Sequence, residues 1–282
     1  MIQLGLTGYP LSHSLSPKLH AAAFKAEELD GEYRLYPIAP GEMDGLAKLA
    51  QAMRAGEIQG LNVTIPYKQA VLSLLDELTP SAQAIGAVNT LYLKDGKLIG
   101  HNTDAPGFLA DQAKLNQHGS SDKIALVLGA GGAARAVVYA LLKDGWQVRL
   151  AVRRSDMDQA NALMESFKGL TGNSPSEIFL LEAGHLADKM FGSRLIVNAT
   201  PIGMFPDVDS SPWPDGLPFP NGAAVYDLVY NPHQTRLVKQ AQAAGLNATT
   251  GLGMLVEQAA LSFACWTGRD VPREVLFAAV EA

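Results

Sequence analysis

The chain has 282 residues, of which 48% are hydrophobic and 18% charged, and its formal net charge is −6. This length suits two domains of ordinary size, and the apolar share permits real cores and excludes a disordered chain. The negative balance argues against non-specific nucleic-acid binding and against an anionic membrane surface. A small anionic substrate would therefore need a local positive site.

The class of protein is narrowed further by its cysteine and histidine content and by its first residues. Cys265 is the only cysteine, which excludes an internal disulfide and a cysteine-based metal cluster. The six histidines show no paired metal-ligand spacing, so we expect no metal. The first residues contain no basic segment typical of a signal peptide, and no apolar run approaches the ~20 residues that span a bilayer. We expect a cytoplasmic protein with no nucleic-acid or membrane partner.

Hydrophobic periodicity and turn residues predict strands and helices that alternate along the chain. Strands are expected at 2–6, 32–37, 61–66, 86–93, 97–100, 123–128, 146–152, 178–181, 195–198, 224–229 and 246–249. Helices are expected at 18–28, 43–56, 69–75, 108–117, 135–143, 157–168, 185–191, 235–244, 255–266 and 273–280. A polar linker is expected at 119–122, and 200–221 carries six prolines and should be irregular. The alternation predicts an α/β fold with a doubly wound parallel sheet.

Several polar side chains stand in the loops of the first third of the chain. Ser14 and Ser16 lie before the first predicted helix, where they can face a polyol; alternatively they cap the helix and shape the turn. Asn62, Thr64 and Lys68 lie around a strand end and a helix entry, at the edge where ligands collect in open α/β sheets. Lys68 is a proton-transfer candidate, with simple solvation as the alternative. Asp104 precedes a helix, and its alternative role is that of an N-cap.

The most informative stretch is a strand, a glycine turn, a helix and a second strand in succession. The turn reads Gly-Ala-Gly-Gly-Ala-Ala from Gly129 to Ala134. Gly129 allows the tight turn, Gly131 lets the backbone approach a pyrophosphate, and Ala134 takes the place of a third glycine. The pyrophosphate would lie at the helix N-terminus, where N–H groups and the helix dipole favour anions. The pattern predicts a dinucleotide site, and an ordinary tight turn is the alternative.

The end of the second strand indicates which dinucleotide is bound. NAD sites usually carry an acid there for the ribose 2′-OH, but 148–154 contains none. Arg153 and Arg154 stand there instead, and guanidinium groups suit a 2′-phosphate. We therefore predict NADP as the cofactor. The alternative is two solvated arginines on a loop.

Taken together, these pieces resemble the shikimate dehydrogenase family along nearly the whole chain. The resemblance is carried, in the family's order, by the blocks 12–17 (SHSLSP), 62–68 (NVTIPYK), 86–90 (GAVNT), 102–104 (NTD), 129–133 (GAGGA), 198–200 (NAT), 226–230 (YDLVY) and 251–258 (GLGMLVEQ). It implies two α/β domains, a substrate domain and a Rossmann-type NADP domain, with an active-site cleft between them. The substrate domain would comprise 1–104 and the C-terminal helices 252–282, and the NADP domain 105–251.

The resemblance also implies the reaction, the reversible reduction of 3-dehydroshikimate to shikimate by NADPH, a step towards aromatic amino acids. Lys68 and Asp104 would be the catalytic pair. The implied substrate contacts are Ser14, Ser16, Thr64, Asn89, Asp104, Tyr230 and Gln258. The implied cofactor contacts are Gly129, Ala130, Gly131, Gly132, Ala133, Arg153, Arg154, Leu228 and Gly251. At Gln258 the alternative is a polar residue on an exposed helix face.

The residue types suit that chemistry. Hydride transfer to a ketone leaves an alkoxide that needs a proton, which Lys68 can supply. The carboxylate of Asp104 would favour the charged ammonium and fix its direction. Two rivals remain: a relative of broader range that uses quinate as well as shikimate, with NAD, and a non-catalytic NADP-binding sensor. We expect a monomer or a homodimer.

Overall fold

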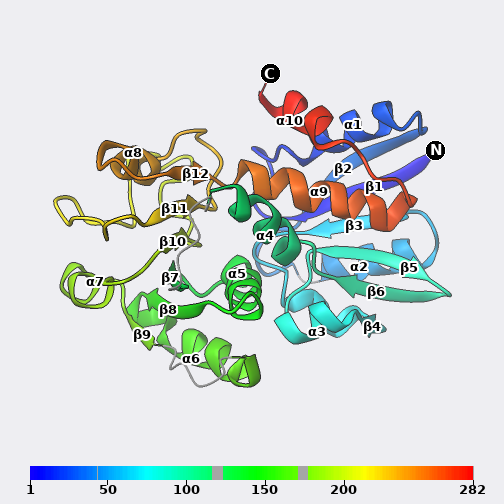
Figure 1. Ribbon diagram of the computed structural model, residues 1–282. Helices are drawn as coiled ribbons and strands as arrows, with labels where there is room; N and C mark the ends of the chain where they lie inside the picture. Colours follow the sequence, from blue (N-terminus) through cyan, green and yellow to red (C-terminus); the bar gives the residue numbers. More distant parts are fainter. Residues whose placement is uncertain (43, 116–122, 171–176, 282) are drawn as a thin grey trace. The chain divides into compact units, whose positions relative to one another are not determined.

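The structure is a computed structural model that describes residues 1–42, 44–115, 123–170 and 177–281 (Figure 1). It divides into two compact units, Met1–Gly107 with Leu255–Ala282, and Phe108–Met254. The sequence placed these divisions at 104/105 and 251/252. The predicted linker 119–122, the first residue of the helix predicted at 43–56 and the last two of the helix predicted at 108–117 lie outside the described residues.

The first unit is built on a six-stranded sheet in the order β2-β1-β3-β5-β6-β4. Its strands are β1 (Ile2–Gly8), β2 (Gly31–Pro37), β3 (Gly60–Val63), β4 (Glu77–Leu78), β5 (Thr90–Lys94) and β6 (Lys97–His101). Its helices are α1 (Ser16–Ala26), α2 (Asp44–Arg54), α3 (Pro80–Ile85), a 3₁₀ helix (Ala70–Leu74), the start of α4 (Asp104–Leu115), most of α9 (Leu252–Thr267) and α10 (Arg273–Glu281). β1 pairs in parallel with β2 and β3, whereas β5 pairs antiparallel with β3 and β6, so the sheet is mixed.

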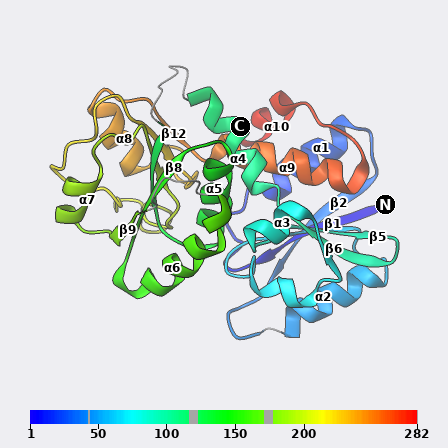
Figure 2. The same cartoon turned by 60° about the horizontal axis from the view of Figure 1, so that its bottom comes forward.

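Alternate residues of β3 face opposite sides of this sheet, as the pleat of a strand requires. Leu61 and Val63 lie in the core under α2, which buries Leu46, Ala50 and Met53 from one helix face. Asn62 faces the other side, where its amide reaches Ser262 of α9. The turned view shows α2 and α9 on opposite faces of the sheet (Figure 2), and α10 lies beside α1 (Figure 1).

Two local predictions for this unit were wrong. The strand predicted at 86–93 begins only at Thr90, because Gly86 takes a left-handed conformation (φ 67°) that ends α3, a helix the sequence did not indicate. The prediction extended the strand over Ala87 and Val88 because both are apolar, and both are indeed buried. A short apolar run does not distinguish a strand from an irregular buried segment. The helix predicted at 69–75 is a 3₁₀ helix.

The second unit is a Rossmann-type domain with a fully parallel sheet in the order β12-β11-β10-β7-β8-β9. Its strands are β7 (Ile124–Leu128), β8 (Gln147–Val152), β9 (Glu177–Leu180), β10 (Leu195–Asn198), β11 (Ala224–Asp227) and β12 (Ala248–Thr250). Its helices are the rest of α4, α5 (Gly132–Lys143), α6 (Met157–Ser166), α7 (Ala183–Lys189), α8 (Arg236–Ala243), the first turn of α9 and two short 3₁₀ helices (Arg154–Asp156 and Lys168–Leu170). Numbered within the unit, this is the order 3-2-1-4-5-6 of dinucleotide-binding sheets. The predicted two-domain α/β fold class is confirmed.

The proline-rich stretch between β10 and β11 is irregular, as predicted, but it is anchored. Trp213 is fully buried, stacks on Phe219 with ring centroids 4.6 Å apart, and donates to the Leu217 carbonyl. Asp215 accepts hydrogen bonds from Arg236 and Gln240 of α8. These contacts attach the stretch to the helix that follows β11.

The described residues contain no helix with both the length and the apolar character needed to cross a membrane. No group of three or more His, Cys, Asp and Glu side chains among these residues is arranged to hold a metal ion.

His20 of α1 is a buried titratable group packed among aromatic rings. Its ring stacks on Tyr33 at 4.1 Å between centroids and lies near Trp266 and Phe263. Neither ring nitrogen makes a hydrogen bond of normal geometry within the described residues. Burial lowers the pKa of His20 from 6.5 to about 3, and only the nearby Asn62 amide opposes this shift. The neutral imidazole is therefore the form that the fold accommodates.

This burial predicts a stability loss in mild acid that His20 causes. Between pH 6.5 and pH 3, His20 binds a proton in the unfolded chain but not in the folded chain, so the free energy of unfolding falls as the pH falls. From pH 7.5 to pH 5, His20 should contribute about 2 kcal/mol of this fall. Urea unfolding of His20→Phe at both pH values should show a fall smaller by that amount. His185→Phe, which replaces an exposed histidine, should behave as wild type; an equal acid loss in His20→Phe would contradict the prediction.

Candidate active site

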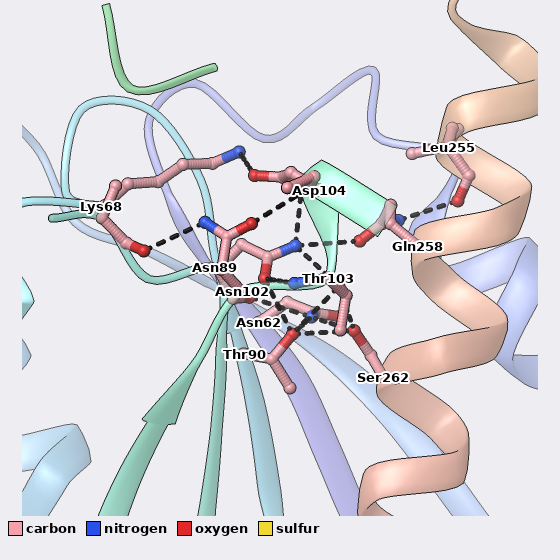
Figure 3. A network of polar contacts seen from close by, with 12 residues as sticks. Asn62, Lys68, Asn89, Thr90, Asn102, Thr103, Asp104, Leu255, Gln258 and Ser262 are labelled. Carbon is pink, nitrogen blue, oxygen red and sulfur yellow. Dashed lines mark hydrogen bonds and ion pairs between the residues drawn. The ribbon is translucent and has the colours of Figure 1, made fainter. Parts of the chain in front are cut away.

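In the first unit, three chain segments that are distant in sequence bring polar side chains together (Figure 3). Lys68 lies in the turns after β3, Asn89 just before β5, and Asp104 at the first residue of α4. Backbone hydrogen bonds hold the segments in register: Val63 N donates to the Asn89 carbonyl at 2.9 Å, and Val88 N donates to the Lys68 carbonyl at 2.8 Å. The site is thus anchored to the sheet at the ends of its strands.

Lys68 and Asp104 form a largely buried ion pair. The Nζ–Oδ2 distance is 2.6 Å, and the two side chains are 11% and 6% exposed. Asp104 is the hydrogen-bond partner of Lys68 Nζ among the described residues. The alternative interpretation of Lys68 as a solvated surface lysine is therefore wrong. The pair holds the Lys68 side chain in a site shielded from most water.

Asp104 does not cap the helix that it begins, so its alternative interpretation is wrong as well. The α4 helix starts at Asp104, and not at Phe108 as predicted, and the Asn102 side chain accepts the Ala105 N–H at 3.1 Å. Pro106 is tolerated there because a proline in the first turn removes no intrahelical hydrogen bond. Because Asn102 takes the capping role, both Asp104 oxygens are available to side chains.

Asn89 connects the ion pair to the C-terminal helix α9. Its Nδ2 donates to Asp104 Oδ1 at 2.9 Å and lies 3.3 Å from Gln258 Oε1, and its Oδ1 accepts the Thr103 N–H at 2.8 Å. Gln258 is only 9% exposed, and its Nε2 donates to the Leu255 carbonyl. The exposed-face interpretation of Gln258 is wrong: the side chain belongs to the polar cluster.

A second layer of buried polar groups lies beneath this cluster. Ser262 Oγ lies 2.8 Å from Thr90 Oγ1 and 3.1 Å from Thr103 Oγ1, and it accepts from Asn62 Nδ2 at 3.1 Å. Tyr33 donates to Asn62 Oδ1 at 2.7 Å. Sequence reasoning missed Ser262, although a signal was present: it stands four residues after Gln258, on the same helix face.

Ser14 lies in the loop after β1, and Ser16 is the first residue of α1, which that loop leads into; Thr64 directly follows β3, the neighbour of β1 in the first sheet. The α1 helix begins at Ser16 itself, and its N-cap residue Leu15 makes no side-chain cap, so the capping interpretation of Ser16 is wrong. Ser14 does shape the turn, since its Oγ accepts the Ser16 N–H at 3.2 Å. Thr64 packs its methyl group against Gly8. In the part of the chain that the structure describes, none of these three residues makes a direct hydrogen bond to the side chain of Lys68, Asn89, Asp104 or Gln258.

In the second unit, the glycine turn has the backbone that the sequence predicted. Gly129 follows β7 with φ 104°, a conformation that favours glycine. A Cβ added at Gly129 would meet the Ala199 carbonyl and the Thr200 methyl at 3.0–3.1 Å, whereas one at Gly131 would meet nothing within 4 Å. Gly131 is the N-cap of α5 and makes no side-chain cap. The turn leaves open space at the start of a helix, which is the arrangement that accepts a phosphate.

Arg153 and Arg154 follow β8, the strand next to β7, and both are exposed, at 71% and 81% of the side chain. Arg153 donates to Asp156 at 2.8 Å, and Arg154 lies 4.0 Å from Glu182. These partners are themselves near the surface, so the guanidinium groups can exchange them for a phosphate.

The remaining predicted residues of this unit follow β11 and β12. Gly251 packs directly against the Leu228 backbone, which leaves no room for a Cβ. Burial raises the pKa of Tyr230. Asp227 ends β11 with a fully buried carboxyl group, and burial raises its pKa to about 6, although hydrogen bonds from Thr235, Val229 and Asn198 oppose this shift.

This combination of units defines a class: a two-domain α/β protein with a Rossmann-type dinucleotide unit. Two family models match the chain, the shikimate dehydrogenase substrate binding domain over residues 6–91 and the shikimate 5'-dehydrogenase C-terminal domain over residues 251–281. The shikimate dehydrogenase (NADP(+)) of Salinibacter ruber is 41% identical over 98% of this chain and 96% of its own length.

Solved structures give the same result. A shikimate dehydrogenase in complex with NADP+ superimposes with a TM-score of 0.89 at 37% identity, covering 100% of this chain and 95% of the other. The shikimate 5-dehydrogenase of Thermus thermophilus, in complex with NADP(H) and shikimate, has a TM-score of 0.83 at 38% identity, covering 100% and 99%. The chain belongs to the shikimate dehydrogenase family.

The buried polar layer predicts a measurable contribution of Ser262 to stability. Ser262→Ala removes one of the three acceptors near Asn62 Nδ2, the others being the Asn89 carbonyl and Thr90 Oγ1, and a partner of Thr90 and Thr103 in a site closed to water. The neighbouring groups keep other partners, so the cost is that of the lost hydrogen bonds, and the free energy of unfolding should fall by about 1–3 kcal/mol. Urea unfolding measures it, with Ser73→Ala, an exposed serine bonded to a carbonyl, as control. Equal stability of the two variants would show that the layer is not coupled to folding.

Proposed function

We propose that this protein catalyses the reversible reduction of 3-dehydroshikimate to shikimate with NADPH. Membership of the family makes it an NADP-dependent oxidoreductase that acts on a CH–OH group. The observation that carries the finer proposal is the Lys68–Asp104 ion pair, held at 2.6 Å inside a buried polar cluster. The reaction would serve aromatic amino acid biosynthesis, in the cytoplasm.

Lys68 would act as the general acid of the reduction and the general base of the reverse reaction. NADPH, when bound, would supply the hydride. The oxygen of the reduced carbonyl then needs a proton, and an ammonium N–H within hydrogen-bond reach of it can deliver one. Asp104 accepts a hydrogen bond from Lys68 Nζ and so fixes the direction of the side chain. Asn89 in turn holds Asp104 Oδ1.

The substrate-binding roles of Ser14, Ser16, Thr64, Asn89, Tyr230 and Gln258 are part of the proposal. Asn89 and Gln258 offer amide groups, which can donate to and accept from the hydroxyls of a polyol. The hydroxyl groups of Ser14 and Ser16 would donate neutral hydrogen bonds to the carboxylate of the substrate. Asp104, in addition to its proposed catalytic role, would accept a hydrogen bond from a substrate hydroxyl.

The glycine turn fits a dinucleotide, with open space at Gly131 and the N-terminus of α5 behind it. The proposed cofactor contacts are Gly129, Ala130, Gly131, Gly132, Ala133, Arg153, Arg154, Leu228 and Gly251. Arg153 and Arg154 would hold the 2′-phosphate that distinguishes NADP from NAD.

A single absorbance assay tests the proposed function. Purified protein with shikimate and NADP+ should raise absorbance at the nicotinamide band. The same assay with quinate and with NAD+ should give a much lower kcat/KM. Comparable rates with quinate and NAD+ would favour the broader relative, and NADPH binding without turnover of any substrate would favour a sensor.

Lys68→Ala should lower kcat for shikimate oxidation by ~10²–10⁴-fold, the range of general acid–base catalysis, while KM for shikimate changes only a few-fold. The reason is that the amine acts on the proton and not on substrate affinity. Lys97→Ala provides the control, because Lys97 is also paired with a carboxylate, Glu77, but at an exposed site. Thermal unfolding should confirm that both variants are folded. Near-normal kcat in Lys68→Ala would remove Lys68 from the role.

The arginine pair predicts a change in cofactor choice. The double variant Arg153→Ala/Arg154→Ala should raise KM for NADP+ by at least about 10–100-fold, since the loss of a single charge-assisted hydrogen bond of about 1.5–3 kcal/mol corresponds to that factor. KM for NAD+ should stay nearly constant, because NAD+ has no 2′-phosphate. Lys168→Ala is the control. Lys168 is an exposed cation of the same unit, and it pairs with Glu165, three residues away, as Arg153 pairs with Asp156. Equal effects on both cofactors would contradict the assignment.

A further inference from the structure

Two polar residues end neighbouring strands of the second sheet at the same register. Asn198 is the last residue of β10 and Asp227 the last of β11, and they are ladder partners. Both are fully buried. Side chains at one register of parallel strands point to the same face, and Asn198 Nδ2 donates to Asp227 Oδ1 at 2.8 Å. A buried pair of this kind at the carboxyl edge lies where open α/β sheets bind their ligands.

Neutral donors surround the Asp227 carboxylate. Besides Asn198, the Val229 N–H donates to Oδ1 at 3.1 Å, and the Thr235 hydroxyl donates to Oδ2 at 2.6 Å. Because the pKa of Asp227 is about 6, the group is mainly ionised at neutral pH and above. All three donors then depend on one carboxylate.

These bonds fix both ends of one loop. Val229 stands at the beginning of the 228–234 loop, and Thr235 follows its end as the N-cap of α8, where its Oγ1 also accepts the Val238 N–H. The loop carries Leu228 and Tyr230. Gly251 packs against the Leu228 backbone.

The partner residue fixes the neighbouring turn in the same way. Asn198 Oδ1 accepts the N–H and the hydroxyl of Thr200, at 3.0 and 2.6 Å. Thr200 and Ala199 border the glycine turn at Gly129. Asp227 thus connects, through Asn198, to the backbone beside the proposed phosphate site, and directly to the 228–234 loop.

We propose that Asp227 is a positioning residue for the cofactor: its carboxylate holds the 228–234 loop and the Asn198–Thr200 turn in the geometry that binds NADP. This inference rests on the proposed function for the identity of the cofactor. Asp227 itself touches no substrate or cofactor in this assignment; it acts through Leu228, Thr200 and Gly251.

The decisive variant is Asp227→Asn, which keeps the size and removes one acceptor. Asn can still accept from Asn198 and Val229, but its amide group would face the Thr235 hydroxyl, which needs an acceptor. The dissociation constant of NADPH, measured by its fluorescence without any substrate, should rise about tenfold, the effect of one lost hydrogen bond to a charged group. KM for NADP+ should rise likewise, while kcat stays within about threefold.

Asp215→Asn is the matched control, since Asp215 also accepts hydrogen bonds from α8 but is exposed. It should leave the dissociation constant within twofold of wild type. A purely stabilising carboxyl group would lower the melting temperature of Asp227→Asn and leave NADPH binding of the folded protein unchanged. That result would overturn the proposal.

Thr235 provides a second, independent variant pair if Asp227→Asn fails to fold. Thr235→Ser keeps the hydroxyl and should bind NADPH as wild type does, whereas Thr235→Val removes the donor and should bind about tenfold more weakly. Equal affinities of the two variants would overturn the proposal. Wild-type protein that binds NADPH but does not oxidise shikimate would refute the proposed function and leave the role of Asp227 standing.

Discussion

The structure of the first unit depends on keeping a charged lysine and aspartate together where water is largely excluded. Removing two charges from water costs several kcal/mol per ion, and their attraction offsets this only if the remaining polar atoms are satisfied. The surroundings of Asp104 meet that condition, because Lys68 occupies one carboxylate oxygen and Asn89 the other. Asn102 relieves Asp104 of helix capping. Much of the local backbone geometry therefore follows from one ion pair, and substitutions that leave one partner alone should be far more damaging than the pair's net contribution suggests.

The α9 helix explains why the first unit needs residues from both ends of the chain. The helix is apolar over most of its length, yet it buries Gln258 and Ser262 on one face. Both reach polar groups contributed by residues 62–103. An apolar helix tolerates buried polar residues only where they meet hydrogen-bond partners, since an unpaired buried polar group costs about 1–3 kcal/mol. The polar layer thus selects this helix and this register, and it makes the C-terminal segment part of the candidate site.

The sequence predicted those features that depend on neighbouring residues. The strand, glycine turn and helix around Gly129 form a local unit, and its backbone agrees with the prediction. The proximity of Lys68 and Asp104 was suggested by family resemblance and not by spacing. Features that depend on distant partners were missed: Asn62 and Ser262 are 200 positions apart, and neither has a local pattern that reveals the other. The α3 helix was missed because its end is set by one left-handed glycine, Gly86, inside an apolar run.

Asp104 in the first unit and Asp227 in the second show that a buried carboxylate can have very different surroundings. Asp104 faces the Lys68 ammonium at 2.6 Å, so its charge is balanced. Asp227 faces neutral donors, so burial disfavours its charge and raises its pKa to about 6. Each hydrogen bond that such a carboxylate accepts stabilises its charge. The donors here belong to a neighbouring strand, a loop and a helix cap. An unbalanced buried charge is therefore a strong constraint on backbone geometry, because every segment that donates to it is held in place by the cost of leaving it unsatisfied.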